Sequence, residues 1–397
     1  MRAQSFAVAA AGATAFLDMY ATQPLLPQLR VALGASEATV AATISALTFA
    51  VAIAAPFVGP LADAIGRKRV IVTTIFVLAF LTLGAAHSRS IGELLAWRFA
   101  QGLVMPGIFA TTLAYIAEEY PPEVAGSGVG AYIGGNVLGG WAGRYVTALV
   151  AAHGTWQTAF LALCALNIVG GIIVLALLPS SKRFVRRASA RGALSAMRGF
   201  LTDSRMLATY ALGACILFAL VAAFTFGTFY LAGPPFELGT AEIGNVYCVY
   251  LFGVVATPLS GRLMDRYGNR ATVLFAIAAS AAGMLATLVH SLAAIVIGLG
   301  LTATGVFIAQ AASQNYIGRI AGASRSTAAS LYLVTYYGGG GLGAILPVWT
   351  WTHFGWPATV GIIVGVQAVA AVLAFFGWQG PAGGVRRSAP EARAVAA

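Results

Sequence analysis

The sequence predicts an all-α membrane protein whose helices cross the bilayer twelve times. Hydrophobic residues make up 59% of the 397 residues, charged residues make up only 9%, and the mean hydropathy is +0.85. In soluble domains, charged residues make up about a quarter of the sequence. A helix rises ~1.5 Å per residue, so a ~30 Å hydrocarbon core requires ~20 apolar residues. Twelve such runs fit into the chain and leave no room for a sizeable soluble domain.

The apolar runs follow one another closely along the chain. We place the spans at residues 6–29, 37–61, 69–87, 93–117, 124–150, 157–178, 206–231, 240–263, 271–289, 292–317, 325–350 and 356–377. The first run is too long and too often interrupted by polar residues for a cleaved signal peptide, so it counts as a span. The 47 glycines suit this fold because small residues let helices approach closely in a bilayer.

The longest polar stretch divides these spans into two sets of six. We expect an N-terminal bundle at 1–178, a cytoplasmic linker at 179–205, a C-terminal bundle at 206–377 and a disordered tail at 378–397. The tail is rich in Gly, Pro and Ala, which favours disorder. The linker is strongly basic, so we expect it to lie against anionic lipid head groups, in part as an interfacial helix.

The basic residues predict the orientation of the chain. Most of its 23 Lys and Arg residues fall on the side of the N-terminus. By the positive-inside rule, both termini are cytoplasmic, and we expect a bacterial inner membrane. The net charge of +11 is therefore interpreted as a topology signal, which argues against nucleic-acid binding.

The sequence offers little support for enzymatic chemistry. Cys164, Cys215 and Cys248 fall inside apolar runs without metal-ligand spacing, which favours a role as small hydrophobic residues. No Walker sequence, His/Glu zinc pair or nucleophile elbow is present. We therefore expect no cofactor, no metal and no enzyme.

Three charged residues lie deep inside the predicted spans, away from the span ends. Asp18 is the only acid there, and Arg98 and Arg144 are the embedded bases. A charge at the bilayer centre costs ~2.5–3.5 kcal/mol, so such residues are functional candidates. Low dielectric disfavours an ionised carboxyl group and a nearby cation favours it. Asp18 could therefore bind and release a proton near neutral pH, or serve only as a structural partner of an arginine.

Two similar stretches lie between apolar runs, one in each half of the chain. They read Gly59-Pro-Leu-Ala-Asp63-Ala-Ile-Gly66-Arg67-Lys68-Arg69 and Gly261-Arg262-Leu-Met-Asp265-Arg266-Tyr-Gly268-Asn269-Arg270. Pattern and repetition resemble the cytoplasmic loop of the major facilitator superfamily between helices 2 and 3 and between helices 8 and 9. The resemblance covers nearly the whole chain. It implies two six-helix bundles related by an axis along the membrane normal.

The resemblance gives these loops a role in gating. Asp63 and Asp265 would each contact the positive N-terminal end of a helix in the other half, near Ser324 to Thr327 and near Gly126 respectively. Such contacts form only when the cytoplasmic side is closed. We assign the gating motif to Gly59, Asp63, Gly66, Arg67, Arg69, Asp265, Gly268 and Arg270. The alternative is a loop that only sets topology.

The resemblance extends to the predicted fourth and fifth helices. Arg98-Phe-Ala-Gln101-Gly102 is similar to the helix-4 motif Arg-x-x-Gln-Gly, which implies that Asp18 and Arg98 couple transport to protons; the alternative is a packing role. Gly135 and the Gly139-Gly140 pair match the antiporter helix-5 motif, but Asn136 occupies its proline position. The chain looks most like the YnfM-type branch of bacterial drug/proton antiporter-like permeases, whose substrates are poorly defined.

Alternating access predicts a central cavity between the halves. Asp18 and Arg98 are expected to line it. The candidate substrate-binding residues are Tyr20, Gln101, Tyr132, Asn136, Arg144, Phe226, Tyr247, Tyr250, Gln310, Gln314, Tyr332 and Tyr336. One acid and two arginines do not make a strongly anionic site, so neutral or anionic amphiphiles are as compatible as cations.

We therefore expect a monomeric, proton-coupled efflux antiporter of small amphipathic molecules, with a small-molecule substrate, protons and the lipid bilayer as its partners. The alternative within transport is a proton symporter or facilitator for a sugar or organic anion, held by Arg98 and Arg144. A membrane sensor or scaffold would require a partner domain, and none is evident in the sequence.

Overall fold

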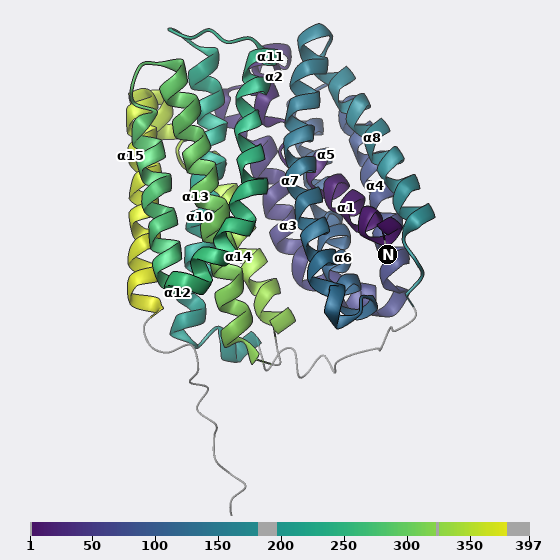
Figure 1. Cartoon of the computed structure of the whole chain (residues 1–397). Helices are drawn as coiled ribbons and strands as arrows, with labels where there is room; N and C mark the ends of the chain where they lie inside the picture. The colour runs from purple at the N-terminus through teal and green to yellow at the C-terminus, as the bar shows by residue number, and fades with distance from the viewer. Residues whose placement is uncertain (1, 182–196, 323–324, 379–397) are drawn as a thin grey trace, which may run out of the picture.

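The computed structural model describes residues 2–181, 197–322 and 325–378. This part of the chain is a bundle of helices without strands (Figure 1). The N-terminal half contains α1 (Arg2–Leu17), η1 (Gln23–Leu25), α2 (Leu26–Ala32), α3 (Glu37–Ile65), α4 (Arg67–Ala86), α5 (Ile91–Val104), α6 (Pro106–Glu119), α7 (Pro122–His153) and α8 (Trp156–Leu177). The C-terminal half contains α10 (Ser204–Ala232), α11 (Thr240–Val246), η2 (Tyr247–Leu251), α12 (Phe252–Ala286), α13 (Leu292–Ile320), α14 (Arg325–Ile345) and α15 (Val348–Gly377).

Eight segments of the described chain are long and apolar enough to cross a membrane. The other predicted spans are interrupted or rich in glycine. The first consists of α1, η1 and α2, the eighth begins with the short α11 and η2, and the fifth and eleventh are the glycine-rich α7 and α14. The twelve predicted crossings are consistent with this arrangement, although several are not single continuous helices.

Single glycines form the turns between some neighbouring spans. Gly66 (φ 100°) separates α3 from α4, and Gly268 (φ 77°) lies within α12, where the predicted eighth span passes into the ninth. Gly355 (φ 70°) divides α15 in the same way. Positive φ is unfavourable for residues with a Cβ atom, which explains why glycine occupies these positions. We call the end that carries the Gly66 and Gly268 turns the basic end, because their arginines lie there.

The two halves repeat the same packing scheme. In the first half, α1 packs against α7 and α4 against α8; in the second, α10 packs against α14 and α12 against α15. Between the halves, α3 packs against α14 and α7 against α11. In Figure 1 the purple and blue half stands beside the green and yellow half, with α2 and α11 close together at the end opposite the basic end.

Glycines allow the close approach of α1 and α7. A Cβ atom added at Gly135, Gly139 or Gly143 would overlap the carbonyl oxygens of Ala9, Ala13 and Leu17, respectively. In the second half, Gly339 and Gly343 of α14 meet carbonyl oxygens of α10 in the same manner. These contacts follow the small-residue packing that is typical of helices in a bilayer.

The linker prediction falls mainly on residues 182–196, and the tail prediction on residues 379–397, which lie outside the described part of the chain. Of the linker, Asp203 caps α10 by accepting hydrogen bonds from the backbone N–H groups of Arg205 (2.8 Å) and Met206 (3.2 Å). The second half therefore begins with a helix start of the usual kind.

Candidate functional site

The first span is broken at its centre. α1 ends at Leu17, residues 18–22 form turns, and η1 and α2 continue to the opposite end. Pro24 and Pro27 are the second residues of the next two helical segments, where their missing N–H groups cause no loss. We call residues 18–22 the α1 break. Irregular backbone at membrane depth is tolerated only where protein or a cavity surrounds it, so this segment marks a site.

Arg98 of α5 binds the backbone of the α1 break. Its guanidinium donates to the carbonyl oxygens of Asp18 (2.8 Å) and Met19 (2.9 Å), and to Gln101 Oε1 (2.8 Å). The side chain is completely buried. Asp18 was predicted as a possible structural partner of an arginine, and Arg98 does bond to it, through the backbone carbonyl group.

The Asp18 carboxylate accepts hydrogen bonds from three different spans. Thr82 of α4 donates to Oδ1 (2.8 Å), Asn167 of α8 donates to Oδ2 (2.6 Å), and Gln101 of α5 donates more weakly to Oδ1 (3.5 Å). Gln101 also donates to Thr82 (2.8 Å), which closes the network. We call Asp18, Thr82, Arg98, Gln101 and Asn167 the Asp18 cluster; all five are fully buried.

The Asp18 cluster lies inside the first half. All its hydrogen-bonding side chains come from α4, α5, α8 and the α1 break. Asp18, Arg98 and Gln101 were expected in a cavity between the halves, and the structure places them behind that interface. The reason is the α1 break, which directs consecutive residues to different sides of the first span.

Arg144 of α7 occupies the interface between the halves. Its guanidinium lies over the rings of Tyr20 (4.6 Å to the ring centroid), Tyr250 (4.2 Å) and Tyr247 (5.5 Å). Tyr20 belongs to the α1 break, whereas Tyr247 and Tyr250 belong to η2 of the second half. Guanidinium groups favour the faces of aromatic rings. The tyrosines therefore stabilise a buried cation from both halves.

Polar contacts complete the surroundings of Arg144. Its Nε donates to Gln23 Oε1 (2.8 Å), one terminal nitrogen donates to Gly140 O, and the other donates to the Tyr250 hydroxyl (3.4 Å). Gln23 in turn donates to Thr225 of α10 (3.4 Å). We call Tyr20, Gln23, Arg144, Tyr247 and Tyr250 the Arg144 site. Among the described residues, no carboxylate forms an ion pair with Arg144.

Other predicted substrate residues have different surroundings. The amide of Asn136 donates to the carbonyl oxygens of Tyr132 and Gly12 (3.2 Å each), so it joins α7 to α1. The Tyr132 hydroxyl donates to Phe109 O (3.3 Å). Phe226 packs against Phe229 and Trp351 near the opposite end, Tyr332 and Tyr336 stack on each other (5.5 Å between centroids), Gln310 is half-buried and Gln314 is exposed.

Further polar contacts between the halves lie at or towards the opposite end. Trp351 Nε1 donates to Glu37 Oε2 (2.6 Å), and Ser45 Oγ donates to Gly341 O (2.8 Å). Glu37 begins α3 and Trp351 lies near the start of α15, both at the opposite end of the bundle. The halves are thus joined by hydrogen bonds on the side away from the basic end.

The comparison with known proteins follows this architecture. The sequence model of the Major Facilitator Superfamily matches residues 8–244 and 234–396. The chain belongs to the Major Facilitator Superfamily. Its relatives include the uncharacterized MFS-type transporter YybF of Bacillus subtilis (strain 168), 29% identical over 367 residues that cover 92% of this chain and 91% of YybF. The predicted superfamily is confirmed, and the chain is a multi-pass membrane transporter rather than an enzyme.

A second relative supports the predicted branch. The inner membrane transport protein YnfM of Escherichia coli (strain K12) is 30% identical over 371 residues, covering 93% of this chain and 88% of YnfM. Among solved structures, the nucleoside transporter NupG (D323A mutant) superimposes with a TM-score of 0.77 over 95% of this chain and 100% of that chain. At 16% identity, this likeness confirms the fold alone.

The residues that the sequence assigned to a gating motif lie around the two glycine turns. Arg67 forms a two-pronged ion pair with Glu118 at the end of α6 (3.1 and 2.8 Å), which joins the start of α4 to the fourth span. Arg69 and Asp265 are exposed, and the guanidinium of Arg270 lies over the Phe375 ring (4.3 Å). The positions of Gly59 and Gly66 in or after α3 are described, whereas the Asp63 side chain and residues 323–324 lie outside the described part.

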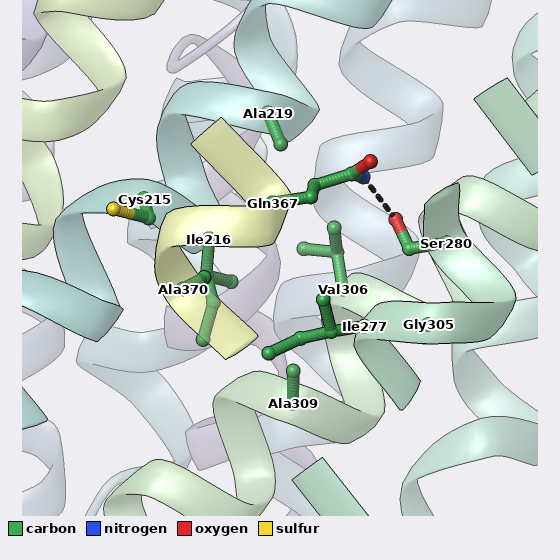
Figure 2. Close-up of a pocket in the computed structure, with 10 residues that line it drawn as sticks. All are labelled: Cys215, Ile216, Ala219, Ile277, Ser280, Gly305, Val306, Ala309, Gln367 and Ala370. Carbon is green, nitrogen blue, oxygen red and sulfur yellow. Dashed lines mark hydrogen bonds between the residues drawn. The ribbon is translucent and has the colours of Figure 1, made fainter. Parts of the chain in front are cut away.

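The second half of this transporter carries a neutral counterpart of the Asp18 cluster. A small cavity of about 10 Å³, room for roughly one water molecule, lies among α10, α12, α13 and α15, the spans that correspond to α1, α4, α5 and α8. Figure 2 shows Gln367 reaching Ser280 across it, at 2.7 Å. The ten residues that line this cavity contain neither an acid nor a base, so the charges of the first half are not repeated there.

Thr82, Asn167 and Gln23 were not among the predicted site residues. Each is a polar residue inside an apolar run, which was the one available signal. Nothing in the sequence alone indicated which of the many such residues would face Asp18 or Arg144.

Proposed function

We propose that this transporter is a proton-coupled antiporter that exports small amphipathic molecules by alternating access. It works as a monomer in the bacterial inner membrane, with the basic end and both termini in the cytoplasm, as the basic residues favour. The observation that carries the proposal is the α1 break. Within six residues, the break and the first residue of η1 present Asp18 to a buried polar network and Tyr20 and Gln23 to the interface between the halves.

The Asp18 cluster has the chemistry of a proton-binding site. An ionised carboxylate only accepts hydrogen bonds, and all three side-chain partners of Asp18 are donors. A protonated Asp18 becomes a donor itself, so one partner must change its role. Thr82 can do so, because its hydroxyl also lies 2.8 Å from Leu78 O and can donate there while accepting from Asp18.

Proton binding at Asp18 is coupled to the interface through the backbone. Arg98 holds the carbonyl groups of Asp18 and Met19, and the next residue, Tyr20, covers the Arg144 guanidinium. A change of charge at Asp18 alters the field on Arg98, to which it lies close, and shifts the break that both sites share. Arginine remains charged in proteins, so the proton exchange falls to Asp18.

The experiment is substrate-induced proton release from the purified transporter, measured across a panel of neutral, cationic and anionic amphiphiles. We expect release from the native chain and none from Asp18→Asn, while Ser280→Ala in the neutral counterpart cluster keeps it. An Asp18→Asn variant that still accumulates substrate against its gradient in proteoliposomes would refute the coupling role.

A second candidate is a proton symporter or facilitator for an organic anion. It is favoured by the buried positive charge of Arg144 at the interface, which lacks an acidic partner among the described side chains. The direction of proton movement separates the two candidates. An antiporter moves protons against the substrate, a symporter moves both together, and a facilitator moves none.

A further inference from the structure

We propose that the Arg144 site binds the carboxylate of a small aromatic acid. This inference rests on the proposed function in one respect, namely that the substrate occupies the interface between the halves. It adds the chemical class of the substrate, and it applies equally to export and to import.

The two buried arginines differ in how their charge is balanced. Arg98 and Asp18 lie in one cluster and balance each other, whereas Arg144 is buried without a carboxylate partner in the described chain. Removing an unpaired charge from water is expensive, and buried charges are normally paired. Tyrosine faces and amide oxygens offset this cost only in part. An anionic ligand would supply the missing charge, and a cationic one would double it.

The hydrogen-bond donors of Arg144 are only partly used. A guanidinium has five N–H donors. Arg144 uses Nε towards Gln23, one terminal N–H towards Gly140 and one towards Tyr250, the last at 3.4 Å. Within the described residues, two donors are left over. Two N–H groups are what a carboxylate engages in a two-pronged contact.

Two tyrosine rings restrict the direction from which a ligand can approach Arg144. Tyr20 and Tyr250 lie 4.6 and 4.2 Å from the guanidinium carbon, measured to their ring centroids, and therefore occupy positions that suit contact with its faces. A ligand then reaches Arg144 along the guanidinium edge, where a planar carboxylate fits. The Tyr20 hydroxyl is buried and has no hydrogen-bond partner, so it can donate to the same ligand.

The aromatic rings around Tyr250 indicate the chemistry of the rest of the ligand. Tyr250 is surrounded by Phe224 (4.6 Å between ring centroids), Tyr247 (6.0 Å) and Phe307 (5.9 Å). Aromatic rings prefer such offset or edge-to-face neighbours at these separations. A flat apolar ring joined to the carboxylate would extend this cluster. The rings now contact one another, so the ligand enters when the two halves separate around Arg144.

The test uses three probes of nearly equal shape: benzoate, the neutral benzamide and the cationic benzamidine. Binding to the purified transporter in nanodiscs is measured by calorimetry. We expect benzoate to bind about ten- to a hundredfold more tightly than benzamide, the usual effect of hydrogen bonds to a charged group, and benzamidine not to bind. Equal binding of benzoate and benzamide, or no benzoate binding at millimolar concentration, overturns the proposal.

Two substitutions locate the site. Arg144→Gln abolishes the preference for benzoate, and Arg144→Lys weakens it, because lysine cannot make the two-pronged contact. The exposed Arg89→Gln is the matched control. Tyr20→Phe, which preserves the ring, weakens benzoate binding without loss of thermal stability and so guards against a folding defect in the Arg144 variants. Unchanged selectivity in Arg144→Gln refutes the assignment.

A final comparison separates this inference from the proton-coupling proposal. Asp18→Asn is expected to keep benzoate binding and to lose coupled proton release. If benzoate binds through Arg144 but Asp18→Asn still couples, the proton site is refuted and the carboxylate site stands. If Asp18 couples transport to protons but the charge at Arg144 has no effect on benzoate binding, the carboxylate site is refuted and the proton site stands.

Discussion

The hydrogen bond between Glu37 and Trp351 gives a quantitative test of how the halves separate. It joins the start of α3 to the start of α15 at 2.6 Å, so an outward opening at this end must break it. Hydrogen bonds to charged groups contribute about 1.5–3 kcal/mol. The Glu37 side chain is 21% exposed, which favours the lower limit. Removing the bond should therefore shift the ratio of conformations by roughly tenfold.

The substitution Trp351→Phe removes the donor and keeps a ring against Phe226 and Phe229, which lie 6.1 and 6.3 Å away between centroids. Spin labels at positions 31 and 237, both exposed and in opposite halves, report the separation in a variant without native cysteines. We expect Trp351→Phe and Glu37→Gln to increase the population with long distances, and the double variant to add little to either.

Arg30→Gln is the matched control for this cycle. Arg30 also contacts Glu37, at 2.6 Å, but both residues belong to the first half and Arg30 is half-exposed. A surface ion pair contributes about 0–1 kcal/mol, and this one does not connect the halves. If the effects of Trp351→Phe and Glu37→Gln are additive, or if Arg30→Gln shifts the distances as much, the bond does not hold the halves together.

Three further predictions follow from packing and charge. Gly139→Ala should lower the free energy of unfolding by about 1–3 kcal/mol, because its Cβ overlaps Ala13 O, whereas Gly130→Ala, which meets open space, should leave the melting temperature unchanged. Thr82→Val should reduce substrate-induced proton release by about tenfold, because it removes a hydrogen bond to a charged group that is worth ~1.5 kcal/mol, whereas Thr82→Ser should retain the release. Export of a monoanion in exchange for one proton moves two charges across the membrane, which is worth ~4.6 kcal/mol per 100 mV. An inside-negative potential should therefore accelerate benzoate efflux from right-side-out vesicles. An efflux rate that does not depend on the potential would contradict this exchange.

The fold was accessible from the sequence because each cue for it is local. Apolar runs, turn glycines and the distribution of arginines are all read within one span or one loop. Gly66 and Gly268 were predicted in the two loop motifs, and both have positive φ in the structure. The basic residues after Gly66 were expected in a loop, but α4 begins at Arg67, because a single glycine completes the turn.

The site was less accessible because its contacts join distant parts of the chain. Asp18, Arg98 and Arg144 could be named in advance, since charges inside apolar runs are conspicuous. Their separation into two sites could not be predicted from the sequence. It depends on the α1 break, where two prolines follow an otherwise unremarkable polar stretch, and on the contact of Arg144 with η2, about a hundred residues further along.

The separation of the two sites itself argues for how coupling could work. If Asp18 faced the substrate, its ionised carboxylate would compete with an anionic ligand for Arg144 and would repel that ligand. In the proposed exchange, Asp18 is enclosed behind the α1 break, so that proton and ligand do not meet and each acts on the same short segment from its own side. Arg98 fixes that segment on one side through Asp18 and Met19, and Gln23 joins it to Arg144 on the other. A rigid, continuous first helix would transmit a change at Asp18 only as a movement of the whole bundle. A broken one can transmit it locally, as a small displacement of Tyr20 and Gln23 against the second half.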